Sequence, residues 1–140
     1  MEDKIIEISR IRLSKAKDNL KVCEDLMEKG YYSFSMNRAY YALFDAIRAV
    51  NALDGFDSSK HSGVIAHFNQ FHIKTGDFDS SFSVTIKQAS FFREKADYDD
   101  FFSAEEKDAS RMLSGVREFI ESVDLYLSER LGEYIDNINQ

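Results

Sequence analysis

One stretch of the chain decides the predicted fold, N-R-A-Y-Y-A-L-F-D-A-I-R-A-V-N-A-L at residues 37–53. Its apolar residues recur at steps of three and four, the spacing of one face of an α-helix. These residues are Ala39, Leu43, Ala46, Val50 and Leu53, widened by Tyr40, Phe44 and Ile47. Because so wide an apolar surface needs neighbours on several sides, the stretch predicts the central helix of a bundle. Its small alanines favour close approach of those neighbours.

Polar side chains interrupt this helix along a single line. Arg38, Asp45 and Arg48 lie on the line with Tyr41 between them, and Asn37 stands at its start. Charged groups are costly to bury without partners. A charged line on a largely apolar helix therefore indicates either a groove or an interface, and the pattern is compatible with both.

The rest of the 140-residue chain predicts helices that cover the central one. It contains no proline and only six glycines, which favours long helices over a sandwich or barrel rich in turns. Helical periodicity predicts helices over residues 3–29, 31–54, 60–73, 80–96 and 104–130. We therefore expect an all-α, up-and-down bundle of four long helices plus one short helix. This single domain should span residues 1–131, followed by a flexible tail at 132–140.

Composition and charge limit the class of protein. The net charge of −7 does not suggest a general nucleic-acid binder, although a local basic groove is compatible with it. Arg10, Lys17 and Lys21 form a basic line on the first helix, which we interpret as a solvated face in preference to an RNA contact. No basic leader and no apolar run of about 20 residues is present, so we expect a cytoplasmic protein that does not enter the membrane. The lone Cys23 fits a reducing compartment. No nucleotide-binding or metal motif is present, so no cofactor is expected.

Three histidines, His61, His67 and His72, fall in the third predicted helix at spacings of six and five. In an α-helix these spacings do not share one face, whereas metal ligands usually stand three or four residues apart. We expect surface or capping histidines and no metal site. In the fourth helix, Arg93 continues an apolar stripe, and Asp97 follows at a spacing that allows an ion pair. The pair indicates either a structural helix end or a phosphate- or partner-binding arginine.

Three blocks of sequence carry a resemblance to a known family. They are M-N-R-A-Y-Y-A-L-F-D-A-I-R-A-V at 36–50, K-H-S-G-V-I-A-H-F at 60–68 with I-K-T-G at 73–76, and R-E-K-A-D-Y at 93–98. In this order they resemble the HEPN domain family, specifically its small stand-alone prokaryotic members, over about residues 9–127. The resemblance implies a helical bundle that forms homodimers facing each other across a groove. Many such proteins are toxins that cut RNA without a metal and are neutralised by a minimal nucleotidyltransferase partner.

The resemblance also implies which residues would act. Members that cut RNA carry an arginine followed a few residues later by a histidine, which would stabilise phosphate charge and move a proton. Arg93 matches the arginine, but no histidine follows it anywhere in the chain. Asp45 also stands where the family often has histidine. These departures favour a non-catalytic or degenerate module of a toxin–antitoxin-like system, a homodimer that binds RNA, a nucleotide or a minimal nucleotidyltransferase.

The binding groove of that module would be lined by Arg38, Tyr41, Asp45, Arg48 and Tyr98, and Tyr98 is also a candidate for modification by the partner. The alternative is a metal-independent ribonuclease toxin that uses Arg93 and Arg38 with Asp97 or Tyr98 as an unusual base. A third interpretation is a bundle whose polar line only fixes the register of a dimer.

Overall fold

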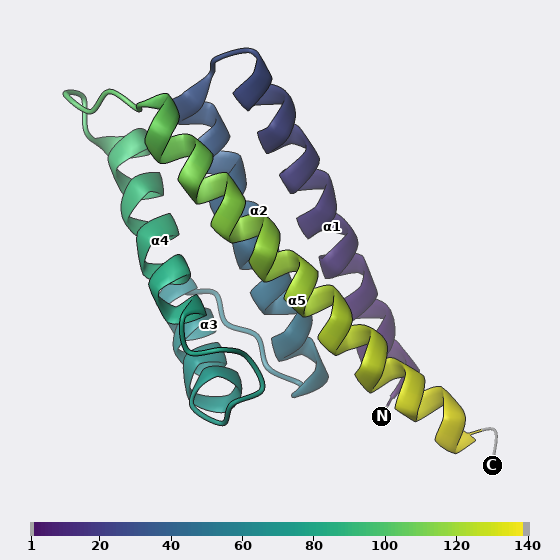
Figure 1. Cartoon of the computed structure of the whole chain (residues 1–140). Coiled ribbons are helices and arrows are strands. Elements are labelled where there is room, and N and C mark those ends of the chain that lie inside the picture. The colour runs from purple at the N-terminus through teal and green to yellow at the C-terminus, as the bar shows by residue number, and fades with distance from the viewer. Residues whose placement is uncertain (1, 139–140) are drawn as a thin grey trace.

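The computed structural model describes residues 2–138, and the regular elements in that range are all helical. They are α1 (Asp3–Glu28), α2 (Tyr32–Leu53), α3 (His61–Phe68), the π-helical segment η1 (Asn69–Ile73), α4 (Phe82–Tyr98) and α5 (Glu106–Ile138). Figure 1 shows α1 and α2 running in opposite directions, with α4 and α5 repeating the reversal after the short α3. The predicted all-α bundle of four long helices and one short helix is confirmed.

The central position of α2 follows from its composition. Fourteen of its 22 residues are buried, and it packs against α1, α3, α4 and α5. Every apolar residue that the sequence placed on its stripe is buried. The fully buried Ala46 and Ala49 let neighbouring backbones come close, and the buried Ser9 hydroxyl of α1 donates a 2.7 Å hydrogen bond to the Ala49 carbonyl. Small residues thus set the close contact between α1 and α2.

The turn between α1 and α2 is a Schellman motif. Gly30 has a φ of +80°, a conformation that glycine adopts without a Cβ penalty. Its amide donates to the Met27 carbonyl at 3.1 Å, and the Tyr31 amide donates to the Leu26 carbonyl at 2.9 Å. The motif satisfies two carbonyls at the end of α1 and reverses the chain in a few residues.

The later helices differ from their predicted bounds. The predicted third helix is an α-helix followed by a π-helical turn, and α4 begins two residues later than predicted. The prediction that the last helix ends near Arg130 is wrong, because α5 continues to Ile138. Buried Leu127 and Leu131 extend its apolar face past that point. The last two residues of the predicted tail, 139 and 140, lie outside the described residues, and both the flexibility of the tail and the 1–131 domain boundary stay predictions.

The loop after α2 doubles back, so that α3 starts beside the middle of α2 and then follows it. The ring of His61 lies 4.2 Å from that of Phe44, and the amide of Asn51 donates to the Val64 carbonyl at 3.0 Å. This path places the start of α3 near the polar line of α2 and its end near the α2 C-terminus. Within the described range, no helix combines the length and the apolarity needed to cross a membrane.

Candidate functional site

Arg93 projects from α4 onto aromatic rings of α2. Its guanidinium carbon lies 4.6 Å from the ring centroid of Tyr40, 6.0 Å from that of Tyr41 and 5.9 Å from that of Tyr98. Its side chain is 15% exposed, which agrees with its place on an apolar stripe. A guanidinium over a tyrosine face is held by attraction to the π-electrons, and this attraction strengthens when water is excluded.

The predicted pair between Arg93 and Asp97 is present but loose, with 3.8 Å between the guanidinium nitrogen and the carboxylate oxygen. Asp97 is held more closely by Asn37, whose amide donates to both carboxylate oxygens at 3.0 and 3.2 Å. The Nε of Arg93 is buried and has no hydrogen-bond partner among the described residues. This nitrogen is closed to solvent, so an anion would meet only the part of the Arg93 side chain that stays 15% exposed.

Arg38 joins this site from α2. Its Nε and Nη2 donate to the Asn37 side-chain oxygen at 2.9 and 2.7 Å, and its Nη1 donates to Asn19 of α1 at 3.2 Å. Its guanidinium carbon lies 5.0 Å from the Tyr41 ring. Asn37 therefore connects the Arg38 guanidinium to the Asp97 carboxylate, and Tyr41 contacts both arginines. We call Asn37, Arg38, Tyr40, Tyr41, Arg93, Asp97 and Tyr98 the arginine–tyrosine site.

The remaining two residues of the predicted polar line have other partners. Asp45 accepts a 3.0 Å hydrogen bond from Asn19, and burial raises the pKa of its carboxyl group. Arg48 pairs with Asp57 at 2.9 Å, and Arg12 contacts the same oxygen at 3.0 Å. Hydrogen bonding to Arg48 lowers the pKa of Asp57. Asp45 thus borders the arginine–tyrosine site through Asn19, whereas Arg48 fastens the loop after α2.

Sequence reasoning missed the histidine that lies next to this site. The Nδ1 of His61, at the start of α3, lies 3.1 Å from the hydroxyl of Tyr40, the ring on which Arg93 rests. Burial lowers the pKa of His61, and the positive charge of Arg93 lowers it further. The available signal was the K-H-S-G-V block, but only the return path of the loop shows that His61 meets α2 at Tyr40.

The expectation that all three histidines are surface or capping residues is wrong for His72, which is 3% exposed. The expectation that their spacings keep them apart is also wrong, because His67 and His72 both contact Asp54. Among the described residues these three form a group whose donor atoms lie close enough to hold a metal ion. The spacing argument assumed a regular α-helix, which η1 interrupts.

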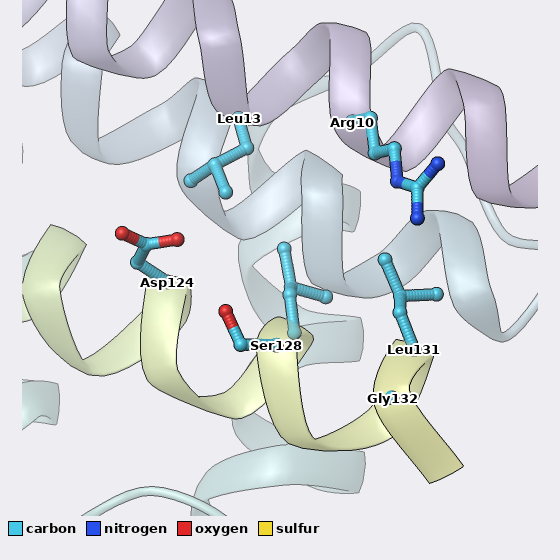
Figure 2. A pocket seen from close by; sticks show the side chains of 7 residues that line it. Arg10, Leu13, Asp124, Ser128, Leu131 and Gly132 are labelled. Atoms are coloured by element: carbon cyan, nitrogen blue, oxygen red, sulfur yellow. The ribbon is translucent and has the colours of Figure 1, made fainter. Parts of the chain in front are cut away.

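A separate cavity of about 360 Å³ opens between α1 and α5, and Figure 2 shows Arg10 reaching toward the α5 side of it. Its lining residues are Arg10, Leu13, Asp124, Leu127, Ser128, Leu131 and Gly132. It shares no residue with the arginine–tyrosine site. The basic line predicted on α1 is partly neutralised here, since Lys17 pairs with Asp124 at 3.0 Å.

The helical bundle and the arginine–tyrosine site define a small all-α protein with a cationic, aromatic contact between α2 and α4. A family model described as the HEPN domain matches residues 9–129. The chain is 30% identical to a Methanocaldococcus jannaschii protein named "Putative toxin MJ0142", over 82% of this chain and 78% of that protein. It is 28% identical to a Thermotoga maritima UPF0332 protein, over 91% and 95% of the two chains. A second M. jannaschii protein, "Putative toxin MJ0605", is 28% identical over 83% and 86%. The chain belongs to the HEPN domain family.

Proposed function

We propose that this protein is the HEPN module of a toxin–antitoxin-like system and that its arginine–tyrosine site binds the phosphate groups of RNA or of a nucleotide. In this proposal it works in the cytoplasm as a homodimer, associates with a minimal nucleotidyltransferase, and does not itself cut RNA. Family membership and the names of its relatives support a toxin-like module. The single observation that supports a phosphate ligand is that two guanidinium groups, those of Arg38 and Arg93, lie 5.0 and 6.0 Å from the ring centroid of Tyr41.

The chemistry of the site suits a phosphate next to a base. Arg93 and Arg38 supply planar, permanently charged donors, the usual choice for phosphate recognition. Tyr98, which is 73% exposed, offers a ring on which a base could stack. Two arginines thus give this site positive charge, although the chain as a whole is acidic.

Exposed aromatic residues support the proposed dimer. Phe91 of α4 is 54% exposed, and Phe101, just after α4, is 99% exposed. Large apolar groups gathered on one element favour burial against another molecule. A second copy that covers α4 would also border the arginine–tyrosine site, as expected for two copies that face each other across a groove.

A second candidate, a metal-independent ribonuclease, is favoured by one observation. His61 and Arg93 both contact Tyr40, so a histidine does lie near the arginine. It comes from α3, whereas the family pattern places the histidine a few residues after the arginine. A histidine with a lowered pKa is neutral at physiological pH and can accept the proton of a ribose hydroxyl. With His61 as the base, the Asp97 carboxylate keeps its hydrogen bonds from Asn37.

One experiment on the purified full chain distinguishes the binding module from the ribonuclease. A labelled single-stranded RNA oligonucleotide is incubated in EDTA with wild type, Arg93→Ala, His61→Gln and the control Arg117→Ala, and both anisotropy and cleavage are measured. Arg117 is a matched control because it pairs with Glu24 on α1 at 3.7 Å, away from the site. The main proposal expects binding without cleavage and a loss of affinity of about 10- to 100-fold in Arg93→Ala only, the loss typical of a charged hydrogen bond.

Cleavage by wild type that disappears in both Arg93→Ala and His61→Gln would select the ribonuclease instead. Binding that is unchanged in Arg93→Ala would overturn both candidates. Sedimentation of wild type and of a Phe91→Ser, Phe101→Ser variant tests the dimer, which the double variant should weaken without loss of helicity.

A further inference from the structure

A second cluster of polar side chains lies at the C-terminal end of α2, where it shares no residue with the arginine–tyrosine site. The Oδ2 of Asp54 lies 2.9 Å from the Nε2 of His67 and 2.6 Å from the Nε2 of His72. These three donor atoms all lie within 4.8 Å of one another. They come from three neighbouring elements, the end of α2, α3 and η1, so the chain has to fold before they meet.

The π-helical turn explains why two histidines five residues apart converge. In η1 the Lys74 amide donates to the Asn69 carbonyl at 2.9 Å, an i→i+5 hydrogen bond. Such a turn accommodates one more residue than an α-helical turn, so positions five apart come to one side. Isolated π-turns are uncommon, and many of them occur at functional sites. The side-chain oxygen of Asn69, at the start of this turn, is buried without a hydrogen-bond partner among the described residues, which lowers the local stability.

The hydrogen bonds around His72 leave one of its nitrogens facing an acceptor. Its Nδ1 lies 2.9 Å from the Oδ2 of Asp77, and an ionised carboxylate can only accept, so Nδ1 carries a proton. In a neutral ring, Nε2 then presents a lone pair to the Asp54 carboxylate 2.6 Å away. Two acceptors 2.6 Å apart need a proton or a metal ion between them, and such a proton can be on the ring or on the carboxyl group. A carboxylate on the far nitrogen is also the usual support of a metal-bound histidine.

The other parts of the cluster are held in place in advance. The ring of His67 stacks on Phe56, with 4.0 Å between centroids and 7° between planes, and lies 4.6 Å from the ring of Phe71. Asp77 is contacted at 3.5 Å by the hydroxyl of Tyr126 from α5. Ligands whose orientations are fixed by packing lose little entropy on binding.

We propose that Asp54, His67 and His72 bind one divalent transition-metal ion of the zinc class, through Oδ2 and the two Nε2 atoms. Two imidazole nitrogens and one carboxylate oxygen suit Zn²⁺ or Co²⁺, whereas Ca²⁺ and Mg²⁺ prefer oxygen ligands alone. Asp54 is exposed, which gives the ion a route in and leaves a position for water. The bound ion joins the end of α2 to η1 and stabilises this end of the bundle.

The donor atoms need a small adjustment to accept the ion. Ligands of a tetrahedral zinc at bond lengths near 2.0 Å stand about 3.3 Å apart, so the two contacts at Asp54 must open by roughly half an ångström. Asp54 lies at the end of α2, and its side chain, at 28% exposed, is the least buried of the three ligands, so it is the ligand that we expect to move.

The test uses the full-length protein after dialysis against a chelator. Zn²⁺ is titrated by calorimetry, and Co²⁺ by visible absorption, which distinguishes tetrahedral from octahedral coordination. We expect one ion per chain, a tetrahedral Co²⁺ spectrum and a raised melting temperature with Zn²⁺. Asp77→Asn should weaken affinity by about 10- to 100-fold, as loss of a supporting carboxylate does elsewhere. His67→Gln should weaken it at least as much, and circular dichroism checks that this variant, whose side chain is 13% exposed in the wild type, still folds.

The matched control is His61→Gln, which removes a histidine of α3 outside the cluster and should bind Zn²⁺ as wild type does. Wild-type protein that is folded by circular dichroism but takes up neither ion would overturn the proposal. Equal Zn²⁺ affinity of wild type and His67→Gln would overturn it too, because the ion would then be bound elsewhere. Neither outcome bears on RNA binding by Arg93, so this inference stands or falls independently of the proposed function.

Discussion

The guanidinium carbon of Arg93 lies 4.6 Å from the ring centroid of Tyr40. The same tyrosine contacts His61 through its hydroxyl group at 3.1 Å. One buried ring of α2 therefore holds an arginine of α4 on its face and a histidine of α3 at its edge. Tyr40 therefore joins α2, α3 and α4 at one point, and substitutions of Tyr40 and His61 can test these contacts separately.

Removing only the Tyr40 hydroxyl should separate the polar contacts of this residue from the packing of its ring. Tyr40→Phe keeps the ring under Arg93 and loses the interactions of the hydroxyl with His61 and with the Arg93 guanidinium, so we expect the free energy of unfolding to fall by about 0.5–1.5 kcal/mol. Tyr40→Ala also removes the buried ring and should cost about 3–5 kcal/mol. Urea denaturation followed by circular dichroism measures both. Equal losses in the two variants would show that the ring contributes nothing beyond its hydroxyl.

Stability should depend on pH through His61. Burial and the charge of Arg93 lower its pKa in the folded state, so between the folded and unfolded values the unfolded chain binds more protons. Its contribution is therefore complete above the unfolded pKa of about 6.5 and is lost as pH falls toward the lower folded value. Urea midpoints between about pH 5 and 8 should fall more steeply on acidification for wild type than for His61→Gln. A shallower slope in wild type would mean that the folded state favours the imidazolium form.

Neutralising Asp97 should strengthen anion binding at the arginine–tyrosine site. The Asp97 carboxylate lies 3.8 Å from the Arg93 guanidinium and competes with any phosphate for it. We expect Asp97→Asn to bind single-stranded RNA about 3- to 10-fold more tightly, the effect of roughly 1 kcal/mol of charge competition. Fluorescence anisotropy at fixed salt measures this.

Asp124→Asn is the control for a general change of charge, because Asp124 pairs with Lys17 between α1 and α5. It should leave affinity close to that of wild type. Weaker binding by Asp97→Asn would indicate that Asp97 positions Arg93 instead of competing for it.

Two glycine substitutions should have opposite effects on stability. Gly30 has a φ of +80° in the turn after α1, so Gly30→Ala should destabilise by about 1–2 kcal/mol. Gly132 lies inside α5 with open space around its Cα, so Gly132→Ala should stabilise by roughly 0.5–1 kcal/mol. Thermal unfolding measures both. No gain from Gly132→Ala would favour the frayed tail that the sequence predicted from residue 132.

Much of the fold was accessible from the sequence because its causes are local. The three- and four-residue apolar spacing defined the central helix, and Gly30 marked a chain reversal that hydrogen bonding within a few residues completes. Arg93 could be recognised from its place on an apolar stripe, and its pair with Asp97 from their spacing. The end of α5 was missed although the four-residue step from Leu127 to Leu131 continues the apolar face past Arg130.

The sites depended on the tertiary structure. By itself the sequence determined the helices, their order and which faces are apolar, since these follow from backbone periodicity and local hydrogen bonding. Only packing decided that His61 meets Tyr40, that Arg48 pairs with Asp57, and that a π-turn brings His72 and His67 to the same carboxylate. The physical reason is that these contacts join residues distant in the chain, and the i→i+5 turn that aligns the histidines overrides the α-helical spacing from which a sequence is interpreted.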